Sequence, residues 1–151
     1  MANTTRFMIN PDFVNMILEN NFGQPTFDFP TADVYVGLGI EFDPESFTFT
    51  KEPVSKYFTI LEKPVKFGDP LNGIIRNLDG IDWPKAKEDW TIGTDTIKYL
   101  GLYYRYEKSD YDTSYKYKLI IVLPLLPEET VKYGEKMSLN PNTIQLRFAN
   151  R

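Results

Sequence analysis

Cysteine and histidine are both absent from this sequence of 151 residues. Without cysteine, the chain has no disulfide bonds, no thiolate metal sites and no thiol nucleophile. Without histidine, it lacks the most common general base and metal ligand, together with every catalytic triad that contains histidine. These absences remove most enzyme mechanisms. We therefore expect a protein that is not an enzyme and that has no catalytic residue, no cofactor and no metal ligand.

Positive charge and long apolar segments are also scarce. The formal net charge is −4, and no part of the chain gathers basic residues into a stripe. A nucleic-acid partner is not expected, since binding phosphates requires such a basic surface. The longest apolar run, residues 119–126, is too short to cross a bilayer and contains Pro124. The first residues lack the apolar core of a signal peptide. We expect no membrane insertion.

Hydrophobic residues, in contrast, make up 42% of the chain and aromatic residues 15%. This composition predicts one ordered globular domain over residues 1–151. A short helix is expected at about 10–22, because Asn10 can cap it, Pro11 suits its first position and Gly23 suits its exit.

The rest of the chain has the alternating pattern of β-strands. Strands are expected at 34–40, 46–51, 56–63, 96–107, 115–126, 135–139 and 143–149. Residues 108–114 form the polar tip between the two long strands, and 62–96 is mostly loop with one short strand near 74–75. With no alternation of strands and helices, this pattern predicts a mainly β fold. We expect an antiparallel, jelly-roll-like β-sandwich over about 33–151, with one short N-terminal helix.

Acidic residues form three small clusters. None has the ligand spacing and glycine of a calcium-binding loop, so solvated turns are the preferred interpretation over ion sites. A pair of carboxylates that hydrolyses a glycoside is a weaker alternative. The clusters are Asp43 with Glu45, Asp79 with Asp82, and Glu107 with Asp110 and Asp112.

Tyrosine is concentrated in the predicted hairpin of residues 97–123. If the strand is regular, Tyr103 faces the opposite side from Tyr104 and Tyr106. Tyrosine is enriched at protein interfaces and its ring also stacks on sugars, so the hairpin is a candidate protein-binding or carbohydrate-binding surface. Ordinary half-buried strand residues are the alternative. The candidate residues are Tyr103, Tyr104, Tyr106, Tyr111, Tyr115 and Tyr117.

Both tryptophans, Trp83 and Trp90, lie in the segment "IDWPKAKEDWTIG" of the long middle connection. A long connection must bury something to stay ordered. We interpret the two indoles as structural anchors that cover hydrophobic ends of the sandwich, while the charged residues between them face water. A contact with a ligand is the alternative.

Several segments follow one another in a characteristic order. They are the helix at 10–22, "VYVGLGIEFDP" at 34–44, Glu52 followed by Tyr57, "IDWPKAKEDW" at 81–90, "LGLYY" at 100–104 and "VKYGEKMSLNPNTIQLRF" at 131–148. In this order the chain resembles a widespread group of small virion structural proteins of tailed bacteriophages. The resemblance covers nearly the whole chain. In the group, phenylalanine usually stands at Trp83, glycine at Thr91 and glycine at Asn142, where asparagine tolerates left-handed geometry.

The resemblance implies a non-enzymatic structural component of a tailed-phage virion, made in the bacterial cytoplasm and placed in the tail or baseplate. It implies other virion proteins as partners, in a homo-oligomer or a symmetric multi-copy assembly. A capsid decoration or head-fibre protein is one alternative. The other, which rests on the tyrosines, is a carbohydrate-binding module that recognises a glycan of the host surface.

Overall fold

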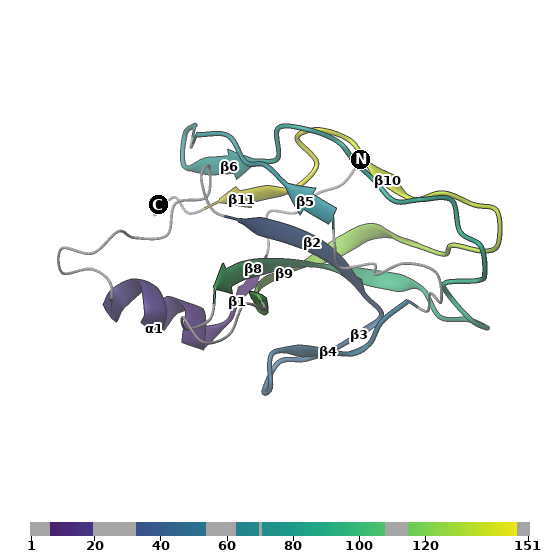
Figure 1. Ribbon diagram of the computed structural model, residues 1–151, viewed down its shortest axis with the longest axis horizontal. Helices are drawn as coiled ribbons and strands as arrows, with labels where there is room; N and C mark the ends of the chain where they lie inside the picture. The colour runs from purple at the N-terminus through teal and green to yellow at the C-terminus, as the bar shows by residue number, and fades with distance from the viewer. Residues whose placement is uncertain (1–6, 20–32, 54–62, 70, 108–114, 148–151) are drawn as a thin grey trace.

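The computed structural model describes residues 7–19, 33–53, 63–69, 71–107 and 115–147. The described part is mainly β, and all its paired strands are antiparallel (Figure 1). The largest sheet has five strands in the order β1-β9-β8-β2-β5. Their bounds are β1 Met8–Ile9, β2 Val34–Gly39, β5 Lys63–Val65, β8 Ile97–Glu107 and β9 Tyr115–Glu129. The predicted pair of long strands is thus confirmed as β8 and β9. The predicted strand 56–63 lies outside the described residues, apart from Lys63.

The single described helix, α1 (Pro11–Glu19), starts at the predicted place. The side-chain oxygen of Asn10 accepts a hydrogen bond from the Asp12 N–H at 2.9 Å, which is the expected N-cap. The amide nitrogen of Asn10 donates to the Leu119 carbonyl, also at 2.9 Å. One buried asparagine therefore both caps the helix and holds its start against β9. Residues 20–22 of the predicted helix lie outside the described part.

Two segments far apart in the sequence form a long antiparallel ribbon. Strand β6 (Ile74–Arg76) pairs with β11 (Gln145–Arg147), and β7 (Ile81–Asp82) pairs with β10 (Ser138–Leu139). Backbone hydrogen bonds continue the pairing from Trp83 to Met137 at 3.1 Å and from Trp90 to Val131 at 2.9 Å. Residues 74–91 and 131–147, here called the ribbon, are therefore joined at intervals along their length. The sequence predicted the short strand at 74–75 but not this pairing.

A buried asparagine joins the two sides of the ribbon between its strand pairs. Asn77 is fully buried, and its side-chain oxygen accepts from the Ile144 N–H at 2.8 Å. Its amide nitrogen donates to the carbonyls of Asp79 at 2.8 Å and Asn140 at 3.2 Å. The side chain thus adds hydrogen bonds between the two sides where the strand pairs are interrupted, so that these buried polar groups are paired.

The ribbon and a short hairpin pack against opposite faces of the five-stranded sheet. Side chains alternate along β2, so Val34, Val36 and Leu38 join the main core with the ribbon, whereas Tyr35 points to the other face. That other face carries the hairpin of β3 (Glu41–Asp43) and β4 (Thr48–Lys51). Figure 1 shows this hairpin on the side of the sheet away from β6 and β11. We refer below to the ribbon face and the hairpin face.

The hairpin begins its second strand later than predicted. Phe47 has a φ of 53° and lies in the turn, so the strand expected from residue 46 starts at Thr48. Phe47 is buried and Phe49 is half-buried, and both pack with the aromatic cluster of the hairpin face. Both phenylalanines therefore face the same cluster, although Phe47 lies in the turn and Phe49 in the strand.

Candidate functional site

Both tryptophans are core residues of the ribbon. Trp83 and Trp90 are each 0% exposed and pack in the same cluster as the sheet residues Leu100 and Leu102. Their backbone N–H groups bond to the opposite side of the ribbon, at Met137 and Val131. The two tryptophans are therefore buried in the main core with residues of the ribbon and the sheet, and their role as anchors stays a prediction.

The candidate tyrosines do not share one surface. Tyr103 is only 8% exposed and belongs to the hairpin face, whereas the half-buried Tyr104 packs toward the ribbon-face core. The predicted opposite orientation of these two neighbours is confirmed, but the buried Tyr103 cannot contribute an exposed ring. Tyr117 is 37% exposed. Tyr111 and the side chains of Tyr106 and Tyr115 lie outside the described part.

Tyr103 and Tyr117 instead meet in a cleft of about 400 Å³ between the hairpin, the start of α1 and strands β8 and β9. We call it the aromatic cleft. Its apolar lining consists of Phe47, Phe49, Tyr103, Tyr117 and Leu119, and its polar lining consists of Asn10, Asp12, Ser46, Thr48, Glu52 and Lys118. The cleft is within the size range of small-molecule sites, and it combines an apolar lining with convergent polar groups as such sites do.

Contacts with neighbouring side chains hold the Tyr117 ring. It packs edge-on against Tyr35, with 5.4 Å between the ring centroids. The guanidinium of Arg105 lies 5.1 Å from the centre of the Tyr35 ring and binds Asp33 through Nε at 2.6 Å. A ring supported on one side and partly exposed on the other can stack on an apolar ligand face without a large loss of rotamer entropy.

Two titratable groups in the cleft are shifted by burial. Burial raises the pKa of the Glu52 carboxyl. Burial also raises the pKa of Tyr103 far above its usual range, and the negative charge of Glu52 adds to this shift. The Tyr103 hydroxyl therefore keeps its proton and can donate a hydrogen bond, while a carboxyl oxygen of Glu52 can accept one. The other lining carboxylate, Asp12, faces Lys118 Nζ at 3.4 Å. This arrangement can bind hydroxyl groups.

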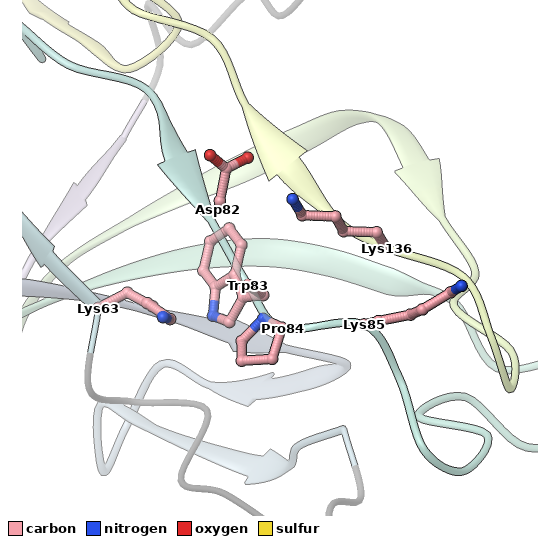
Figure 2. A pocket seen from close by; sticks show the side chains of 6 residues that line it. All are labelled: Lys63, Asp82, Trp83, Pro84, Lys85 and Lys136. Carbon is pink, nitrogen blue, oxygen red and sulfur yellow. The ribbon is translucent and has the colours of Figure 1, made fainter.

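A second depression lies on the ribbon and has a different character. It has a volume of about 560 Å³ and is lined by Lys63, Asp82, Trp83, Pro84, Lys85 and Lys136. We call it the lysine depression. Figure 2 shows Lys63 and Lys136 reaching toward Trp83 from two sides, while Lys85 extends outward. Three ammonium groups and one carboxylate give it a positive local charge on a chain whose net charge is negative.

The acidic clusters do not form a metal centre in the described residues, where no group of three or more potential metal ligands is found. Asp43 closes the hairpin turn, since its carboxylate accepts from the Glu45 N–H at 3.1 Å and the Ser46 hydroxyl at 2.8 Å. The hydrogen bond from the Ser46 hydroxyl, followed by that from the Glu45 backbone, lowers the pKa of Asp43. Asp110 and Asp112 lie outside the described part.

The comparisons with known proteins find no family model, no curated protein and no solved structure that matches this chain. Within the described residues, no helix combines the length and the apolar character needed to span a bilayer.

Sequence reasoning did not identify Glu52, Ser46 or Thr48 as cleft residues. The lining comes from residues 10–12, 46–52, 103 and 117–119, which are brought together only by strand pairing and by the packing of the hairpin. No local spacing signals such a site. The lysine depression likewise combines β5 with both sides of the ribbon.

Proposed function

We propose that the protein is a non-enzymatic structural component of a tailed-phage virion, present in several copies in the tail or baseplate and held there by protein–protein contacts. The observation that carries this proposal is that the segments resembling phage virion proteins pair with one another. Residues 34–38 pair with 100–104 in the sheet, and 81–90 pair with 131–139 in the ribbon. These segments build the frame of the domain, which supports a structural reading of the resemblance.

We also infer that the sheet and the ribbon act as the two layers of a small β-sandwich. The main core lies between them and contains both tryptophans together with side chains from β2, β8 and β9. Two antiparallel layers that enclose one core are the arrangement on which sandwich folds are built. A rigid framework of this kind suits a building block that must keep its surfaces in fixed positions.

The location is tested by immunogold electron microscopy of purified phage particles with an antibody raised against this chain. We expect label at the tail or baseplate. Label over the capsid would instead support a decoration or head-fibre protein, which uses the same framework at another place. If neither intact nor disrupted particles carry label, the virion proposal fails.

A second candidate function is recognition of a host-surface glycan, and the aromatic cleft is the observation that favours it. The partly exposed Tyr117 ring can stack on a sugar face, while Tyr103 and Glu52 supply a donor and an acceptor for sugar hydroxyls. A glycan array with the folded protein tests this function. Binding should be lost in Tyr117→Ala and retained in Tyr133→Ala, because Tyr133 is 74% exposed and lies outside the cleft. An array without signal from folded protein would exclude the function.

A further inference from the structure

We propose that the lysine depression receives the acidic hairpin turn of a second copy of this chain, so that copies join head to tail. The acidic hairpin turn is defined by Asp43 and Glu45 at the β3–β4 turn together with Glu41, which begins β3. This inference rests on the proposed multi-copy assembly and names the contact that would build it.

The lysine depression has unbalanced positive charge. Among the described residues, no carboxylate forms an ion pair with Lys63, Lys85 or Lys136. Asp82 is the one acidic residue in its lining. Lysine ammonium groups around a depression of about 560 Å³ would gain from the approach of carboxylates, since each is a strong donor to an ionised acceptor.

The depression is also held in a fixed shape by the ribbon. Lys85 and Lys136 come from its two opposite sides, and Lys63 begins β5 of the sheet. The backbone bond between Trp83 and Met137 lies close in sequence to both ribbon lysines, and Figure 2 shows Trp83 between Lys63 and Lys136. A preformed basic site requires little ordering of backbone when a partner binds.

The acidic hairpin turn carries the complementary charge. Glu41 and Glu45 are exposed, and Asp43 keeps its turn in a defined shape through its hydrogen bonds to Glu45 and Ser46. The hairpin's lysine, Lys51, lies opposite Glu41 in the strand register and binds Asp95 at 2.6 Å. Residues 41–51 carry three carboxylates and one ammonium group, so the hairpin has a net negative charge, and Asp43 and Glu45 lie at the end away from Lys51.

The positions of the two surfaces decide the kind of assembly. The hairpin packs on one face of the sheet, whereas the lysine depression belongs to the ribbon on the other. A contact between two different surfaces is heterologous, and it forms a ring when the rotation between copies closes, or a filament when it does not. Both outcomes agree with a component that occupies a symmetric particle in several copies.

The test is self-association of the full chain, measured by sedimentation velocity over a range of protein concentrations. We expect association that weakens with added salt, as exposed charge contacts do. Glu41→Lys with Glu45→Lys should weaken the association about tenfold or more, as should Lys63→Glu with Lys136→Glu. A mixture of these two reversed proteins should recover association, because each again meets the opposite charge on its partner.

The matched control is Lys98→Glu with Arg147→Glu, which changes the net charge by the same amount at exposed positions outside the depression. It should associate like the original chain, and circular dichroism should show that every variant is folded. A monomeric original chain, or reversed variants that associate normally, would overturn the proposal. The immunogold result does not depend on this contact. A failure of the head-to-tail contact can therefore be distinguished from a failure of the virion proposal.

Free anions are the other occupant that the experiment must distinguish, with tripolyphosphate as the probe. If Lys63→Glu with Lys136→Glu abolishes binding of this probe while the hairpin reversal leaves association unchanged, the depression is a site for a free anion and the head-to-tail contact is wrong.

Discussion

The two faces of the five-stranded sheet are covered in different ways. On the ribbon face, an irregular pair of segments buries Trp83 and Trp90 completely against the sheet. On the hairpin face, two short paired strands with a register shift between Glu41 and Phe42 leave Phe42 and Phe49 half-buried and an aromatic cleft open beside them. Strand pairing alone thus does not close a face. A face of the sheet is closed when the segment that covers it directs enough large side chains toward the sheet. The hairpin face is not closed in this way and retains room for a ligand.

The first prediction tests the closed face and has the largest expected effect. Replacing Trp90 by alanine should lower the free energy of unfolding by about 3–5 kcal/mol, because it removes a large, fully buried ring. Tyr133→Ala, at a position that is 74% exposed, should change it by less than about 0.5 kcal/mol. Denaturant unfolding measures both values. A loss below about 1 kcal/mol for Trp90→Ala would show that the ribbon does not close its face.

The second prediction concerns how the irregular ribbon stays paired. Asn77→Ala should lower the free energy of unfolding by about 2–4 kcal/mol, since it leaves the buried Ile144 N–H without its acceptor and removes two further bonds. Asn140→Ala is the control, because Asn140 is exposed and accepts the Asn77 bond through its backbone carbonyl. Equal losses in the two variants, measured by urea denaturation, would contradict the role of the Asn77 side chain.

The third prediction sharpens the description of the hairpin face. Gly101 lies beneath Phe49, and a Cβ atom placed there would stand 2.7 Å from the ring atom Cε2 of Phe49 and 2.7 Å from Cδ1 of Leu119. Gly101→Ala should therefore cost about 1–3 kcal/mol through overpacking. In a Phe49→Ala background the cost should be smaller, because the ring is gone. A double-mutant cycle measured by thermal or denaturant unfolding checks this; identical costs in both backgrounds would mean that Phe49 does not pack over the glycine.

The fourth prediction has the smallest effect and concerns pH. Burial raises the pKa of Glu52 in the folded state above its ordinary value of 4.5, so folding favours the protonated carboxyl. The stabilisation that Glu52 contributes is fully present below pH 4.5. It is lost as the pH rises through the raised pKa of Glu52 in the folded state. The Glu52→Gln variant should lack this loss, so its stability relative to the original chain should rise across that window. Unfolding curves at several pH values measure the difference, and a constant difference would show that the carboxyl is solvated.

Local signals predicted part of this structure from particular residues. Asn10 and Pro11 predicted the start of α1, and the alternation in β8 and β9 predicted the long hairpin and the opposite orientation of Tyr103 and Tyr104. Asn142 has a φ of 65°, in agreement with the left-handed geometry that the sequence predicted at this position. Each of these features depends on neighbours in the sequence, because caps, turns and strand alternation are local.

The sequence by itself determined that the chain is mainly β, has a capped helix that starts near residue 10 and has no cysteine or histidine chemistry. Only the tertiary structure decided that residues 74–91 pair with 131–147, that Tyr103 is buried, and that Glu52 meets Tyr117 across a cleft. The physical reason is that cross-strand pairing and burial depend on segments separated by many residues, whose partners no local pattern names. The residues of the lysine depression likewise come from three separate segments of the sequence, which only the folded sheet and ribbon bring together.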